Sequence, residues 1–216
     1  MIELILILNI NMVDPSQHTR GPCQCGEEHK YSDLYGEDLF FEINFALLEC
    51  FNQKNSNSIK SVIRPYEQLK KHLANPLLLT ESDYGPELVV RIPFKGEVRV
   101  KSITISGADD GMAPRNVKIY KDETTVDIDI VRDKKCVQEI KLLENLDGKV
   151  DYPVNHSKFS GVSNIVLGFD ETFGASTCGV HFIGIKGDYL RAKPKMGDIK
   201  YEVRATHAPP VTEESR

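Results

Sequence analysis

Two histidines and two cysteines lie close together near the N-terminus, at His18, Cys23, Cys25 and His29. Thiolate and imidazole groups are the usual ligands of a structural zinc ion. Cysteine pairs in zinc sites are usually separated by about two to four residues, whereas Gln24 alone separates this pair. We therefore predict that these four side chains are weak metal candidates in a flexible, polar arm, and that the protein holds no metal or other cofactor.

A second pair of reactive side chains is formed by Cys178 and His181. A cysteine with a neighbouring histidine as base is the arrangement of a nucleophilic hydrolase. His181, however, stands between Val180 and Phe182 in a run of β-forming residues, which favours a ring on the outer face of a sheet. No aspartate or asparagine stands nearby in sequence to orient the ring. A Cys/His hydrolase is therefore the least favoured of the functions considered.

The most acidic loop expected in the chain is Gly107–Gly111, which contains Asp109 and Asp110. Carboxylates are hard ligands that suit Ca²⁺, but an EF-hand needs ligands at alternate positions ending in glutamate. The apolar Met112–Pro114 breaks that alternation, so a solvated turn is predicted. Nucleophile-elbow, P-loop and Rossmann motifs are absent from the sequence.

Composition disfavours several classes of function. The net charge of −5 disfavours non-specific binding to nucleic acid or to an anionic membrane, both of which need a basic surface. The chain has no tryptophan, and aromatics make up 8%, which disfavours sugar clefts and single-strand platforms built on stacked rings. Five cysteines without a paired framework indicate a reducing compartment. We therefore expect the protein in the cytoplasm, and also in the nucleus.

The first residues, Met1–Met12, form an apolar run that is too short to span a bilayer. The run also lacks the basic region and the cleavage site of a signal peptide. Two interpretations remain, an additional edge strand or a start site at Met12. We favour the second, because the residues from Met12 onwards have the polar composition of an ordinary N-terminus.

Valine and isoleucine dominate three runs in the centre of the chain, Leu88–Phe94, Val98–Gly107 and Asn116–Tyr120. Side chains branched at Cβ suit a pleated, half-buried surface, so these runs predict strands. The polar Lys95–Glu97 lies between the first two runs and predicts a hairpin turn.

The second of these runs changes parity along its length. Val98 and Val100 share one face of the expected strand, whereas Ile103 and Ile105 fall on the opposite one. Either both faces of this strand are covered, or a bulge near Ser102 resets the alternation. Both alternatives place the run in the middle of a β-structure.

Further β-type runs flank this centre, and turn residues separate them. They are Leu39–Ile43, Leu48–Phe51, Val126–Ile130, Val137–Leu142, Lys149–Val154, Ser163–Phe169, Val180–Lys186 and Tyr201–Arg204. One short helix is expected, with Pro65 as its first residue, Tyr66, Leu69 and Leu73 at helical spacing, and His72 in solvent. Many short strands with hardly any helix predict an all-β, antiparallel sandwich or barrel.

A family resemblance rests on segments that occur in one order over Asp33–Gly187: ELVVRIPFKGEVRVKSITISG, PRNVKIYK, SKFSGVSNIVLGFDETFGAST and VHFIGIKG. They resemble the PITH domain, the proteasome-interacting module at the C-terminus of a thioredoxin-like protein. The Cys-x-Cys arm makes the chain more similar to the stand-alone PITH domain-containing proteins. No Cys-x-x-Cys motif is present, so the redox activity of the fused relatives is not carried over.

The resemblance implies an antiparallel β-sandwich of jelly-roll, galactose-binding-like type without catalysis of its own. We expect a flexible N-terminal arm over 1–32, the domain over 33–190, and a C-terminal extension over 191–216 with a tail that its composition predicts to be disordered. The resemblance also implies a non-catalytic adaptor that associates with the regulatory particle of the 26S proteasome. The alternative function is a jelly-roll domain that binds a carbohydrate or another small molecule.

Contacts with a protein partner are expected at loop tips, because a rigid sandwich leaves its loops free to meet another molecule. The loops selected are Asp109–Arg115 and Glu171–Thr177. The predicted partner-contact residues within them are Asp109, Asp110, Arg115, Glu171 and Phe173.

Overall fold

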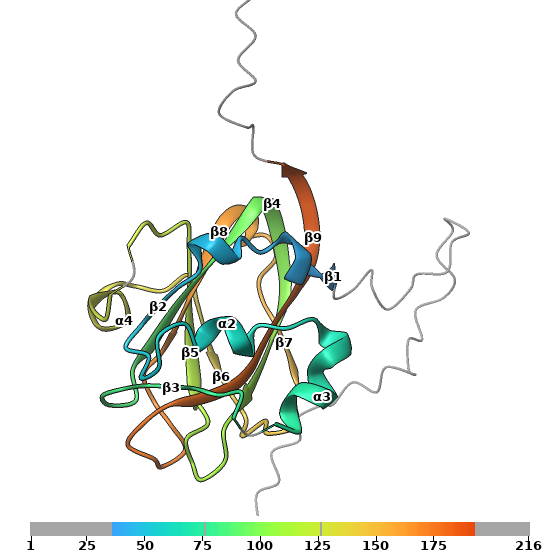
Figure 1. Ribbon diagram of the computed structural model, residues 1–216. Coiled ribbons are helices and arrows are strands. Elements are labelled where there is room, and N and C mark those ends of the chain that lie inside the picture. Colours follow the sequence, from blue (N-terminus) through green and yellow to red (C-terminus); the bar gives the residue numbers. More distant parts are fainter. Residues whose placement is uncertain (1–35, 76, 126, 193–216) are drawn as a thin grey trace, which may run out of the picture.

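The structure is a computed structural model that describes residues 36–75, 77–125 and 127–192 (Figure 1). Several predictions lie outside these residues and are not tested by it. They are the weak metal candidates His18, Cys23, Cys25 and His29, the start site at Met12, and the strand over Tyr201–Arg204.

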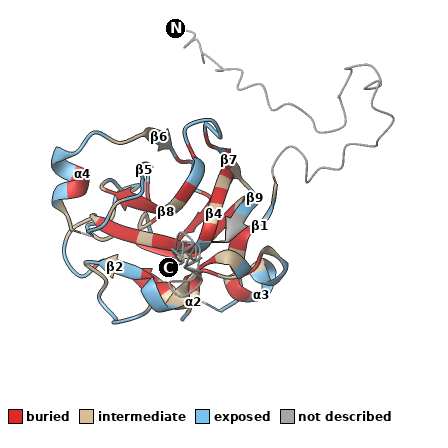
Figure 2. Cartoon of the chain, turned by 90° about the horizontal axis from the view of Figure 1, so that it is seen from above, coloured by how far each residue is buried: buried red, intermediate tan, exposed pale blue. Residues whose placement is uncertain are grey.

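The described residues form one antiparallel β-sheet that curls on itself (Figures 1 and 2). Its main path runs in the order β1-β9-β4-β8-β5-β6, while β2 and β7 also pair with β4, and β3 pairs with β9. The strands are β1 Glu37–Asp38, β2 Glu49–Phe51, β3 Thr80–Glu81, β4 Leu88–Gly107, β5 Asn116–Lys121, β6 Gln138–Lys141, β7 Asp151–Pro153, β8 Ser160–Phe169 and β9 Gly179–Ala192. The predicted all-β class and antiparallel sandwich are thus confirmed.

The long strand β4 belongs to both layers of this sandwich. Its first half lies between β2 and β8, whereas its second half lies between β7 and β9. Register shifts around Val98 mark the corner where the strand passes from one layer to the other. Strands that switch layers do so through such bulges.

The hairpin predicted at Lys95–Glu97 is therefore wrong, because β4 continues through these residues without a turn. Gly96 and Glu97 pair instead with Ala192 and Arg191 at the far end of β9. A polar triplet between two apolar runs looks like a turn in sequence, but here it lies at the corner of one continuous strand, with Lys95 exposed and Gly96 buried.

The parity change in β4 has the predicted cause. The pairing of β4 with β9 shifts register between Val100 and Ser102, which is a bulge at the expected position. As a result Val98, Val100, Ile103 and Ile105 all belong to one core cluster. The opposite face is covered as well, since Ser102 is fully buried, so both alternatives apply to this strand.

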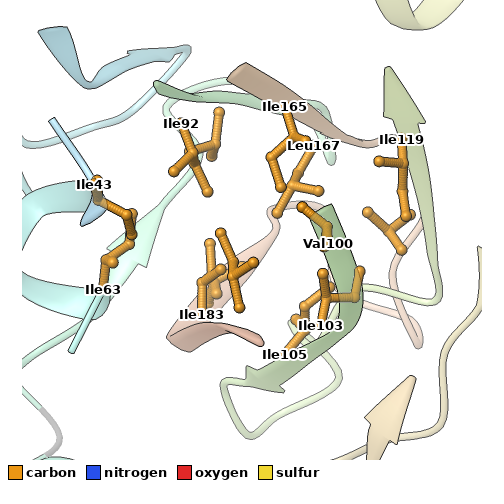
Figure 3. Close-up of a cluster of buried hydrophobic side chains, with 14 of the residues drawn as sticks. Ile43, Ile63, Ile92, Val100, Ile103, Ile105, Ile119, Ile165, Leu167 and Ile183 are labelled. Carbon is orange, nitrogen blue, oxygen red and sulfur yellow. The ribbon is translucent and has the colours of Figure 1, made fainter. Parts of the chain in front are cut away.

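The core fills the space inside the curled sheet (Figure 3). Ile119 on β5, Ile165 on β8 and Ile183 on β9 approach one another from the surrounding strands. Ile43 and Ile63, the second of which directly follows α2 (Ile59–Val62), close the remaining side. Burial between facing layers is the main favourable term for this fold.

Two predicted strands are helical turns, and an aspartate near the start of each accepts a local backbone hydrogen bond. The run Leu39–Ile43 forms the 3-10 helix η1 (Leu39–Glu42), in which Asp38 accepts a hydrogen bond from the Phe40 N–H at 2.9 Å. In the run Val126–Ile130, Asp127 accepts from the Ile130 N–H at 3.1 Å, and α4 (Asp129–Asp133) follows. Such local bonds favour helical turns over strands.

Some helices cover outer faces of the sheet, and the described residues contain more helices than the single one predicted. α4 packs Val131 against Tyr120 and Val166. The predicted helix lies where expected but begins after Pro65, and it consists of η3 (Tyr66–Gln68) and α3 (Leu69–Leu73). A further 3-10 helix, η2, spans Phe45–Leu47.

The expectation that His72 lies in solvent is wrong, because its side chain is 4% exposed. The pair η3–α3 packs onto the outer face of β9, where the Tyr66 ring meets the Phe182 ring edge-on at 5.5 Å. His72 lies on the covered side of α3, with its ring 6.3 Å from that of Phe182.

Candidate partner-binding surface

The two loops selected for partner contacts lie side by side at one end of the sandwich. Asp109–Arg115 connects β4 to β5, and Glu171–Thr177 connects β8 to β9. Because β4 pairs with β9 and β5 pairs with β8, both loops cross between the layers at the same end. We call these two segments the loop pair.

Backbone hydrogen bonds join the two members of the loop pair. The Arg115 N–H donates to the Glu171 carbonyl oxygen at 2.8 Å, and the Phe173 N–H donates to the Ala113 carbonyl oxygen at 3.1 Å. The Ala175 N–H donates to the Gly111 carbonyl oxygen at 3.1 Å. The loop pair is therefore a single unit whose two backbone segments are joined by hydrogen bonds.

The predicted contact side chains project from this backbone into solvent. Asp109, Asp110, Arg115, Glu171 and Phe173 are all exposed, and 38% of the Phe173 surface is accessible. A fixed backbone with free side chains lowers the conformational entropy lost on binding. The structure thus brings together in one surface all the residues selected for contact, although their role in binding is not tested by it.

Cys178 and His181 are not arranged as a nucleophile and its base. Cys178 is fully buried in the core, and burial raises the pKa of its thiol far above the usual range. The His181 ring donates through Nδ1 to the Leu78 carbonyl oxygen at 3.0 Å. A thiol that stays protonated at neutral pH is a weak nucleophile, so this pair does not support hydrolysis.

The described residues contain no group of three or more histidine, cysteine, aspartate or glutamate side chains placed to hold a metal ion. The predicted solvated turn at Asp109 and Asp110 is exposed. Asp110 adopts a left-handed φ of 58°, and Gly111 follows with φ 73°. Within the same residues, no helix has the length and apolar character needed to cross a bilayer.

An open depression of about 540 Å³ lies on the outer surface beside β2. It is lined by Glu49, Cys50, Phe51, Thr124, Thr125 and Asp127. Burial raises the pKa of the Cys50 thiol to about 12, so this cysteine is also protonated at neutral pH. Phe51 is the one aromatic side chain in the lining, which does not make the stacked platform on which sugar sites rely.

A polar cluster that sequence reasoning missed lies on the outer face of β4 and β9. Asp151 accepts a hydrogen bond from the Thr104 hydroxyl and forms an ion pair with Lys186. The Tyr66 hydroxyl bonds to Thr104, and the Lys186 ammonium lies 4.1 Å from the centre of the Tyr66 ring. Burial raises the pKa of Tyr66. The cluster joins η3, β4, β7 and β9, and no sequence spacing signals it because each residue comes from a different segment.

Comparison with known proteins assigns the chain to a family and agrees with the fold described above. The sequence profile of the PITH domain matches residues 29–205. A PITH domain-containing protein of Drosophila melanogaster is 34% identical over 202 residues, which cover 88% of this chain and 90% of that protein. PITH domain-containing protein 1 of Homo sapiens is 30% identical over 197 residues, with coverage of 88% and 90%.

Among solved structures, the chain resembles one that contains the CBM32-1, CBM32-2 and M60 catalytic domains of ZmpB from Clostridium perfringens. The TM-score is 0.51 at 14% identity, and the match covers 75% of this chain and 16% of that one. This likeness concerns the fold alone. The fold is a jelly-roll β-sandwich of the galactose-binding-like type, as the family resemblance implies. The chain belongs to the PITH domain family.

Proposed function

We propose that this protein is a non-catalytic adaptor that binds a protein partner through the loop pair. The observation that carries the proposal is the hydrogen-bonded backbone of the loop pair. It presents Phe173 among the charged side chains of Asp109, Asp110, Arg115 and Glu171. An accessible aromatic ring surrounded by charged groups is the composition expected of a binding hot spot with its rim.

The partner that we propose is the regulatory particle of the 26S proteasome, in the cytoplasm and the nucleus. Membership of the PITH domain family supports this choice, since the family resemblance implies a proteasome-interacting module. The carbohydrate-binding alternative is disfavoured by the lack of tryptophan in the chain and by the single ring beside the depression at β2.

Affinity purification from cell lysate, with quantitative mass spectrometry of the captured proteins, tests this proposal. We expect the wild-type protein to enrich proteasome subunits above a folded acidic control protein. The double variant Glu171→Lys/Phe173→Ala is expected to lower that enrichment about tenfold. A tenfold loss corresponds to roughly 1.4 kcal/mol of binding free energy, which is less than the loss of a single hot-spot residue costs.

The matched control is Phe41→Ala, which removes another exposed ring. Phe41 is 69% exposed, and its carbonyl oxygen accepts a hydrogen bond from Lys95 at the corner of β4. Lys95 lies twelve positions before Gly107, where β4 ends and leads into the loop pair, so Phe41 lies away from the loop pair. Capture by this variant should equal that of the wild type. If the wild type enriches no proteasome subunit, the proposed partner is wrong; if both variants bind equally well, the loop pair is not the contact.

A further inference from the structure

A basic pocket of about 240 Å³ lies beside α3, on the side of β9 that α3 covers. Its lining consists of Arg64, Gln68, Lys71, His72 and Leu78. No carboxylate belongs to this lining, and neither Arg64 nor Lys71 forms an ion pair with another described residue. These two cations create a local positive potential on a chain whose net charge is −5.

Two histidines hold the walls of this pocket in place. The buried His72 donates through Nε2 to the backbone carbonyl oxygen of His181 at 2.5 Å. The His181 ring in turn donates through Nδ1 to the Leu78 carbonyl oxygen at 3.0 Å. These bonds tie α3 to β9 and β9 to the segment before β3. Two of the lining residues, His72 and Leu78, are therefore held in place by the fold itself.

The positive charge of the pocket comes from Arg64 and Lys71. Burial lowers the pKa of His72, and the charge of Arg64 lowers it further, so His72 is neutral at pH 7. The Arg64 guanidinium can bind both oxygens of a carboxylate, and the Lys71 ammonium adds a second charged donor. Gln68 supplies amide donors, while Leu78 offers an apolar contact for the methylene groups of a side chain.

The pocket adjoins the loop pair through the start of β9. The Gly179 N–H donates to the Met112 carbonyl oxygen in the loop pair at 2.8 Å, and His181 follows two residues later. A basic pocket therefore lies beside a loop pair that carries Asp109, Asp110 and Glu171. A partner with an acidic segment next to a basic one would match both parts of this surface.

We propose that the pocket formed by Arg64, Gln68, Lys71, His72 and Leu78 binds a glutamate or aspartate side chain from an acidic peptide segment of the protein partner. The inference rests on the proposed adaptor function and specifies the chemistry of the partner. The small volume fits one acidic side chain, and the net charge of −5 repels extended polyanions such as nucleic acid or an anionic bilayer.

Fluorescence anisotropy with a labelled peptide of alternating glutamate and glycine tests this assignment. At low ionic strength the wild type should bind this peptide and ignore the matching glutamine–glycine peptide. Lys71→Glu should weaken binding at least about tenfold, which corresponds to one charge-assisted hydrogen bond. The matched control is Lys135→Glu, which makes the same change of charge at an exposed lysine outside the pocket and should shift the Kd less than about twofold.

Equal weakening by the two variants would mean that only net charge matters, and it would overturn the assignment. Binding of inorganic phosphate without any binding of the glutamate peptide would also overturn the assignment, in favour of a general anion site. Capture of proteasomes by the wild type separates the two proposals: capture without peptide binding rejects the pocket alone. Peptide binding without capture rejects only the proposed partner.

Discussion

Replacement of Ile105 by aspartate is expected to unfold the protein. The Ile105 side chain is 2% exposed and lies in the main core cluster, on the part of β4 that pairs with Ile183 of β9. A lone carboxylate in this position loses its hydration without gaining a partner, which costs several kcal/mol. That cost is comparable with the whole stability of a domain, roughly 5 to 15 kcal/mol.

The measurement is a circular-dichroism spectrum at 25 °C followed by urea unfolding. Ile105→Val is the control, because it removes one methyl group and should cost about 0.5 to 1.5 kcal/mol while the fold is kept. An Ile105→Asp variant that unfolds at the same urea concentration as the Ile105→Val variant would show that this side chain is not in the core.

Gly187→Ala is expected to lower the free energy of unfolding by about 3 kcal/mol, at the upper end of what overpacking costs. A Cβ at this position would lie 2.0 Å from the Arg99 carbonyl oxygen and 3.1 Å from Leu39 Cδ1. The first of these is a backbone atom of β4 next to the bulge, so it cannot move aside as the end of a side chain can. Gly187 also pairs with Glu37 of β1, so the strain reaches three strands.

Equilibrium unfolding in urea measures this loss, with Gly161→Ala as the control. Gly161 has φ 70°, but its Cβ would meet only the Glu97 carboxylate at 3.8 Å. The control should therefore cost about 1 kcal/mol, which is the strain of a left-handed residue. A Gly187→Ala variant as stable as the control would contradict the close approach of β9 to β4.

Runs rich in β-forming residues predicted the strands that carry the core. Val98–Gly107, Asn116–Tyr120 and Ser163–Phe169 all lie within β4, β5 and β8, because side chains branched at Cβ suit a pleated surface that is buried against other elements. The bulge near Ser102 was also readable from the change of parity along its strand.

The failures have local or long-range causes. The run Val126–Ile130 alternates like a strand, and Leu39–Ile43 is rich in β-forming residues. In each case an aspartate at the start, Asp38 or Asp127, accepts a backbone hydrogen bond that favours a helical turn, and both aspartates were visible in sequence. The corner at Lys95–Glu97 depends on pairing with the distant end of β9, for which nearby residues carry no signal.

The candidate site was predicted in part. Loop position alone selected Asp109–Arg115 and Glu171–Thr177, but their union into one surface depends on the pairing of β4 with β9 and β5 with β8. The basic pocket was missed because α3 was expected to expose His72, whereas the outer face of β9 buries it. Which face of a short helix is covered follows from the sheet beneath it.

Hydrogen–deuterium exchange of this protein, free and bound to purified 26S proteasome, tests the adaptor account most directly. Binding is expected to slow exchange in peptides from the loop pair, over 109–115 and 171–177. Exchange in η1 (Leu39–Glu42), which contacts the corner of β4 at Lys95, should stay unchanged. Unchanged exchange throughout the loop pair in a complex that has formed would contradict the account.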